Sequence, residues 1–164
     1  MKIVIHDASV LIDLDRCGLL ETWLAGGVEA HTSDLVMLEM TQPLHDLVAR
    51  GLLRVCHLNT AELIELTAFQ ARQPRSLSFE DCSVLSLAIK MEAALLTGDA
   101  DLRKAAEAES VEVHGLLWVL DELVGSSHLP PVRATIILQE LLKNPRARLP
   151  KQECNARLER WRQA

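Results

Sequence analysis

The chain has few aromatic residues and no long apolar run. Only 3% of its 164 residues are aromatic and none is tyrosine, which argues against nucleic-acid recognition by stacked bases. No uncharged apolar stretch reaches the roughly 18 residues of a membrane-spanning helix. Asp7 also interrupts the N-terminal segment where a signal peptide needs its apolar core. We therefore expect a cytoplasmic protein with no membrane partner.

The cysteines form neither a zinc-binding pattern nor a disulfide framework. Cys17, Cys56, Cys82 and Cys154 are far apart, and no two of them make a CxxC pair. A chain of 164 residues can bury a core without metal or disulfide staples. We expect all four to be small, reduced side chains of a core.

Positive charge is scarce except near the C-terminus. Residues 1–129 carry 9 Lys and Arg against 20 Asp and Glu, whereas residues 130–164 carry 8 against 3. The net charge of −6 argues against nonspecific duplex binding, because Lys and Arg make the phosphate contacts. The tail cations either guide RNA or form the solvated face of a terminal helix that docks through Leu158 and Trp161, and the second interpretation is preferred. These cations are Lys143, Arg146, Arg148, Lys151, Arg157, Arg160 and Arg162.

Short apolar runs alternate with helical segments along the chain. Strands are predicted at 2–6, 28–32, 52–58, 93–97 and 111–114. Helices are predicted from Ser33 to about Gln42, at 60–71, 78–93 and 100–108, and through the remainder with a break at 126–131. This alternation predicts an α/β three-layer sandwich around a mainly parallel sheet. We expect one domain over residues 1–125 and a helical extension, residues 126–164, packed on it.

Two aspartates follow predicted strands. Asp7 comes directly after the first strand, and Asp99 comes just past Gly98 after the fourth. In a doubly wound sheet these two strands flank the switch point, where such folds bind ligands at the carboxyl ends of the strands. The alternative for each aspartate is a helix N-cap.

Two further acids are expected to face inward from helices. By helical periodicity Glu39 lies between Leu35 and Val36, so a buried carboxylate is predicted that needs a metal or a partner such as Arg. Asp81 lies on the apolar side of its helix, although a capping box with Ser78 explains it equally well.

Four converging carboxylates would repel one another without a cation, and oxygen ligands suit Mg²⁺ or Mn²⁺. Ser9 and Thr97 stand where a hydroxyl can donate to a ligand carboxylate, although Ser9 alone is also an ordinary helix N-terminal residue. His6 points to the other face of its strand and is expected to be a hydrogen-bonded core histidine. Asp13 is assigned to a solvated helix face and Glu80 to the surface beside Asp81.

The order of these segments resembles a PIN-domain nuclease. The segments are AspAlaSerValLeuIle (7–12), an inward Glu39, PheGluAspCysSerValLeuSerLeuAla (79–88) and LeuLeuThrGlyAspAlaAspLeu (95–102). GlyLeuLeuTrpValLeu (115–120) is similar to the end of that family's domain, so the resemblance covers about residues 1–125.

The resemblance implies a Rossmann-like fold and Mg²⁺- or Mn²⁺-dependent cleavage of single-stranded RNA, as in the toxins of VapBC toxin–antitoxin pairs. It also implies an antitoxin or a second copy of the chain as partner, while the long tail leaves a stand-alone nuclease open. Ser9 departs from the family, because many relatives carry Asn there. By the same resemblance, the catalytic, metal-binding acids are Asp7, Glu39, Asp81 and Asp99, with Asp101 as an auxiliary metal ligand and Ser9 and Thr97 as polar neighbours.

Two other functions remain open from the sequence. The first is a catalytically silent PIN-like binding module that keeps the acids, which metal-dependent cleavage would distinguish from a nuclease. The second is a receiver-type phosphoacceptor domain, which needs a Lys after a late strand. The segment after the fifth predicted strand offers no Lys, so this function is disfavoured.

Overall fold

The computed structural model describes residues 1–40 and 44–164. They form two compact units, Met1–Leu116 and Leu117–Ala164. The predicted division after residue 125 falls at the end of α8 (Leu116–Gly125), whereas the two units divide at the beginning of this helix. Packing of the tail on the N-terminal domain stays a prediction. No helix in the described part of the chain is long and apolar enough to cross a membrane.

The first unit is built on a parallel sheet of five strands. They are β1 (Ile3–His6), β2 (Glu29–Ser33), β3 (Arg54–Cys56), β4 (Ala94–Leu96) and β5 (Val113–His114), in the spatial order β3-β2-β1-β4-β5. Each strand overlaps one of the five predicted runs. Val4, Ile5, Leu95 and Leu96 have no exposed surface, as expected for central strands covered on both faces.

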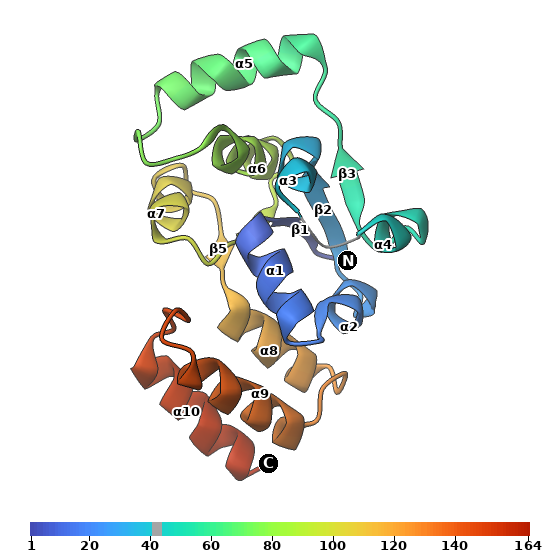
Figure 1. The fold of residues 1–164 in the computed structure, drawn as a ribbon, viewed down its shortest axis with the longest axis vertical. Helices are drawn as coiled ribbons and strands as arrows, with labels where there is room; N and C mark the ends of the chain where they lie inside the picture. Colours follow the sequence, from blue (N-terminus) through green and yellow to red (C-terminus); the bar gives the residue numbers. More distant parts are fainter. Residues whose placement is uncertain (41–43) are drawn as a thin grey trace. The chain divides into compact units, whose positions relative to one another are not determined.

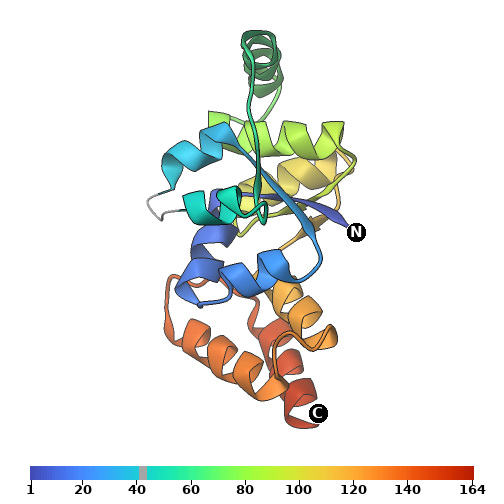
Figure 2. The ribbon, with the colours of Figure 1, turned by 90° about the vertical axis from the view of Figure 1, so that its right-hand side faces the viewer.

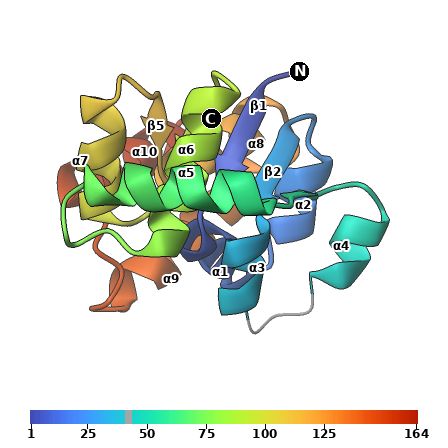
Figure 3. The ribbon, with the colours of Figure 1, turned by 90° about the horizontal axis from the view of Figure 1, so that it is seen from above.

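Helices cover both faces of this sheet (Figures 1 and 2). The helices α1 (Ala8–Arg16) and α2 (Leu20–Ala25) lie on one face, and α6 (Phe79–Lys90) and α7 (Ala100–Ala108) lie on the other. The arrangement confirms the predicted three-layer α/β/α sandwich. Figure 3 shows α5 (Thr60–Ala71) crossing the outer side of α6.

Polar residues fix the starts of several helices. Ser33 accepts a hydrogen bond from the Val36 amide at the start of α3 (Asp34–Glu39), and Asn59 forms a capping box at the start of α5. The predicted end of α3 near Gln42 lies outside the described residues, and the helix ends at Glu39. The short helix α4 (His45–Ala49) precedes β3.

The direction of strand addition reverses between β1 and β4. The strands β1, β2 and β3 follow one another toward one edge, while β4 pairs with the other side of β1 through Ile5–Leu95 and His6–Leu96. This reversal is the switch point at which doubly wound sheets bind ligands. The predicted placement of the first and fourth strands beside each other is confirmed.

The second unit contains most of α8, α9 (Pro131–Lys143) and α10 (Lys151–Arg162). Asp121 of α8 accepts hydrogen bonds from two arginines of α10, from Arg157 at 2.8 Å and from Arg160. Leu158 and Trp161 are buried, so the predicted apolar side of the terminal helix is confirmed.

Candidate functional site

Asp7 is buried at the end of β1, with 5% of its surface exposed. Its amide donates to the Leu96 carbonyl at 3.0 Å, which joins its backbone to β4. Its side chain makes no capping bond to α1. Instead, Oδ2 accepts hydrogen bonds from the Ser9 hydroxyl at 2.7 Å and the Thr97 hydroxyl at 2.9 Å. Asp7 thus occupies the N-cap position of α1, as the alternative held, but its side chain makes no capping hydrogen bond.

The two hydroxyls lock this carboxylate between the ends of β1 and β4. Ser9 Oγ accepts from the Gly98 amide at 3.0 Å, and Thr97 Oγ1 accepts from the Asp99 amide at 3.0 Å. Since each hydroxyl is already an acceptor, its single proton is directed to Asp7. The hydrogen bond predicted from a hydroxyl to a neighbouring carboxylate is present for both residues.

Asp99 caps α7 with one carboxylate oxygen. Its Oδ1 accepts from the amides of Asp101 at 2.9 Å and Leu102 at 2.8 Å. The capping alternative thus holds for this oxygen, while Oδ2 receives no hydrogen bond from the described residues. Asp101 is exposed in the first turn of α7, where its negative charge interacts favourably with the helix dipole.

Asp81 both caps α6 and lies within electrostatic influence of Asp7 and Asp99. Its Oδ2 accepts from the Ser78 amide at 2.9 Å, and its own amide donates to Ser78 Oγ at 3.0 Å, so the capping box is present. Burial raises the pKa of Asp81, the hydrogen bonds from Ser78 oppose that rise, and the negative charges of Asp7 and Asp99 add to it. The cap and the charged neighbourhood therefore coexist at one side chain.

The predicted burial of Glu39 is wrong. Glu39 is exposed at the last position of α3, where Met40 already turns into extended backbone, so no further helical turn packs it against the sheet. Its carboxylate is nevertheless within electrostatic influence of other acids. Partial burial raises the pKa of Glu39, and the charges of Glu80, Asp7 and Asp81 raise it further. Glu39 is thus exposed to solvent but still influenced by the charges of these acids.

These acids have no cationic partner within the described residues. None of the ion pairs there includes Asp7, Glu39, Asp81 or Asp99, which also removes the alternative of an Arg beside Glu39. Like charges that lie close to one another are stabilised by a cation between them. We call these four residues the acidic group.

The donor chemistry of the acidic group fits a hard divalent cation. Asp7, Asp81 and Asp99 each commit one oxygen to hydrogen bonds that orient the carboxylate. Their other oxygens accept no hydrogen bond from the part of the chain that the structure describes. An all-oxygen set suits Mg²⁺ or Mn²⁺. No three described His, Cys, Asp or Glu side chains form a ready-made metal site, so coordination requires these side chains to turn toward a common point.

Two acids near the group were assigned to the surface from the sequence. Asp13 is half-buried on α1, and a Cβ placed on Gly98 would lie 4.0 Å from its Oδ2 and 3.6 Å from Ser9 Oγ. Burial raises the pKa of Asp13, and Arg16 opposes the rise. Because Asp13 is four residues after Ser9, the helical period of α1 was the signal that could have found it. Glu80 contributes through its charge on Glu39.

His6 is a neutral core residue, as predicted. It has no exposed surface, and its Nε2 accepts a hydrogen bond from the Trp23 indole at 2.8 Å. The proton therefore belongs on Nδ1, which donates to the Val4 carbonyl at 3.1 Å. Burial lowers the pKa of His6 to about 4.

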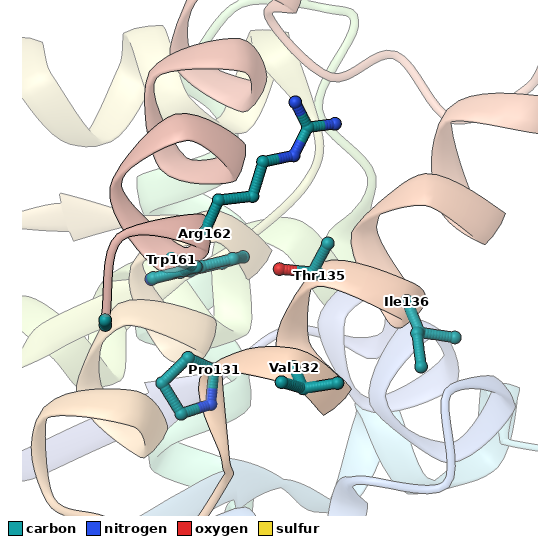
Figure 4. Close-up of a pocket in the computed structure, with 7 residues that line it drawn as sticks. Pro131, Val132, Thr135, Ile136, Trp161 and Arg162 are labelled. Atoms are coloured by element: carbon teal, nitrogen blue, oxygen red, sulfur yellow. The ribbon is translucent and has the colours of Figure 1, made fainter.

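A separate groove lies in the second unit (Figure 4). It is formed by the start of α9 and the end of α10, and Val132 and Ile136 on its rim are 69% and 51% exposed. Thr135 and Arg162 also line it, but its lining includes no Asp, Glu or His side chain. The groove therefore lacks the groups that metal-dependent hydrolysis requires.

Comparison with known proteins agrees with this fold. A family model described as a PIN domain, DUF3368, matches residues 3–163. No curated protein sequence matches the chain. Among solved structures, the chain is similar to a PilT N-terminus domain protein from the hyperthermophilic archaeon Sulfolobus solfataricus P2, with a TM-score of 0.52 and 14% identity over 76% of this chain and 92% of that one. The chain belongs to the PIN-domain family.

Proposed function

We propose that the chain is a divalent-metal-dependent ribonuclease that hydrolyses phosphodiester bonds of single-stranded RNA. PIN domains are generally nucleases that use divalent metal ions. One observation carries the proposal for this chain. Asp7 and Asp99 follow the paired strands β1 and β4, their charges raise the pKa of Asp81, and each of the three carboxylates has one oxygen oriented by hydrogen bonds and one without a described donor.

The four carboxylates have two kinds of role in this proposal. Asp7 and Asp99 would bind Mg²⁺ or Mn²⁺ directly, and Glu39 and Asp81 would bind directly or through water. Such an ion supplies charge stabilisation at a phosphoryl oxygen and lowers the pKa of water. The Ser9 and Thr97 hydroxyls hold the Asp7 carboxylate at a fixed angle, which limits the reorganisation that binding requires.

The exposed position of Glu39 supports access for substrate. The buried Asp7 stands at the floor of the acidic group and Glu39 at its solvent side. A phosphodiester that approaches from solvent would therefore meet the Glu39 side first.

The test is RNA cleavage by purified protein with Mg²⁺ or Mn²⁺. Asp7→Asn should remove most of the activity, because it removes the charge while the side chain can still accept the two hydroxyl hydrogen bonds. Asp15→Asn is the matched control, since Asp15 is an exposed acid of α1 outside the acidic group. Full activity of Asp7→Asn, or equal loss in both variants, would refute the assignment. Metal binding without any cleavage by the wild type would favour a catalytically silent binding module.

The toxin role stays a prediction from the resemblance. It is tested by inducing the chain in a bacterial host and measuring growth. Wild type should arrest growth and Asp7→Asn should not. Growth that continues with soluble, active wild-type protein would favour a stand-alone nuclease.

A further inference from the structure

Arg162 lines the groove of the second unit, and the other six cations of the C-terminal tail named above fall into two groups with different environments. Arg157 and Arg160 are held by Asp121, and the Arg157 side chain is only 18% exposed. These two cations therefore stabilise the contact between α8 and α10. The other four cations lie in the segment that connects α9 to α10.

The segment 143–151, which we call the basic loop, carries Lys143, Arg146, Arg148 and Lys151 and no acid. Lys143 pairs with the exposed Glu140 at 2.6 Å. Within the described residues, the other three cations form no ion pair, and all three are exposed. An exposed arginine without an acid partner gives up no existing ion pair when it binds a phosphate, and its planar fork suits phosphate oxygens.

Asn144 holds the basic loop in a turn, through its side chain and through its backbone carbonyl. Asn144 accepts hydrogen bonds from the Arg146 amide at 2.9 Å and the Ala147 amide at 3.0 Å, which forms a turn. Pro145 and Pro150 restrict the backbone on either side. A loop that is already restricted loses less conformational entropy when it binds a ligand.

Exposure alternates along the basic loop. Arg146 and Arg148 are exposed, whereas Ala147 and Leu149 are partly buried. Arg146 and Arg148 are thus both open to solvent, and the residue between them, Ala147, is less exposed. This spacing suits a ligand with repeated negative charges rather than a single anion.

We infer that the basic loop binds the phosphates of the single-stranded RNA that the proposed nuclease cleaves. The inference rests on the proposed function for the identity of the ligand. Residues 1–129 carry 20 acids against 9 cations and repel a polyanion. The basic loop supplies the positive charge that this part of the chain lacks, and it anchors RNA through phosphates without reading its sequence.

The test measures binding of fluorescein-labelled single-stranded RNA by anisotropy, with EDTA present to prevent cleavage, over a series of salt concentrations. The double variant Arg146→Gln/Arg148→Gln removes two phosphate contacts, so the slope of log affinity against log salt should fall by about 1.4. This change corresponds to about 25-fold weaker binding near 0.1 M salt. The charge-preserving variant Arg146→Lys/Arg148→Lys should keep most of the slope.

The matched control is Arg75→Gln/Arg133→Gln, which removes the same charge at two exposed positions outside the basic loop. This control should keep the wild-type slope. An unchanged slope in the loop variant, or an equal loss in the control, would overturn the inference. A wild-type chain that does not bind RNA but forms a dimer lost in the loop variant would also overturn it, in favour of an acidic protein surface as ligand.

Binding and cleavage separate this inference from the proposed function. Loop-dependent RNA binding by a wild-type protein that cleaves nothing with Mn²⁺ would support the inference and refute the nuclease. Cleavage by the wild type together with a wild-type salt slope in the loop variant would support the nuclease and refute the inference.

Discussion

Acidification should destabilise the first unit through His6. The folded chain holds His6 neutral, with a pKa lowered from 6.5 to about 4 by burial. Unfolding exposes the imidazole, which then takes up a proton below its ordinary pKa of about 6.5. Between these two values the unfolded state binds more protons than the folded state, so stability is lost as the pH falls. Above about pH 6.5 the residue is neutral in both states and contributes no pH dependence.

The size of this effect follows from the two pKa values. Between about pH 7.5 and 4.5, linkage predicts a loss of about 2.5 kcal/mol in the free energy of unfolding from His6 alone. At about pH 5.5 the loss is about 1.4 kcal/mol. His6→Gln removes the titrating group and keeps an acceptor for the Trp23 indole, so its stability should depend less on pH by these amounts.

Urea unfolding at each pH measures the effect, in a chain whose residues Trp118 and Trp161 are replaced by Phe so that Trp23, the sole tryptophan of the first unit, is the fluorescent probe. The control His45→Gln changes an exposed histidine of α4 and should leave the pH dependence as in the wild type. A second measurement needs no variant, because an NMR titration of the wild type follows the imidazole directly. Equal pH dependence in wild type and His6→Gln, or a His6 that titrates near 6.5, would refute the reasoning.

Three further predictions concern the acidic group and its supports. Ser78→Ala removes an acceptor of the capping box and should lower the free energy of urea unfolding by about 1 kcal/mol; a value equal to the wild type would show that the box adds nothing. Thr97→Val keeps the side-chain shape but takes a donor from Asp7 and an acceptor from the Asp99 amide, so we expect a loss of about 1–3 kcal/mol in the same assay. Asp7→Asn removes a negative neighbour and should lower the pKa of Asp81 in a carbon-13 NMR titration, and an unchanged Asp81 would contradict the proximity of the two charges.

The sheet and its layers were predictable because burial dominates their sequence pattern. Central parallel strands are covered on both faces, so the segments 3–5 and 93–96 within the predicted strands are continuously apolar and stand out from the amphipathic helices between them. The same strand pattern predicts a candidate site at the carboxyl ends of these strands. Asp7 and Asp99 each come directly after a strand or one residue beyond it, and the pairing of β1 with β4 brings these ends together.

The position of Glu39 was only half predictable. Helical periodicity placed it on the same side as the other acids, whose charges do influence its pKa, but it assumed that the helix continues past residue 39 and that the sheet covers it. The structure ends α3 at Glu39, which leaves this side chain exposed. Asp13 shows the opposite error, because it was assigned to a solvated helix face although its position one helical turn after Ser9 places it on the side of α1 that approaches Gly98.

The acidic residues near the switch point also show why two interpretations of a residue need not exclude each other. Asp81 and Asp99 use one oxygen each as a helix cap, as the simpler interpretation held. Their remaining oxygens are left for another ligand. Asp7 is different, because its carboxylate accepts two hydrogen bonds from hydroxyl groups and makes no capping hydrogen bond.

The most direct test of the account is a calorimetric titration of the purified, EDTA-treated protein with Mn²⁺. The account predicts saturable uptake by the wild type, strong weakening in Asp7→Asn and in Asp99→Asn, and unchanged uptake in Asp15→Asn. Absence of uptake by the folded wild type, or uptake that survives both substitutions, would contradict the claim that these carboxylates form a cation site.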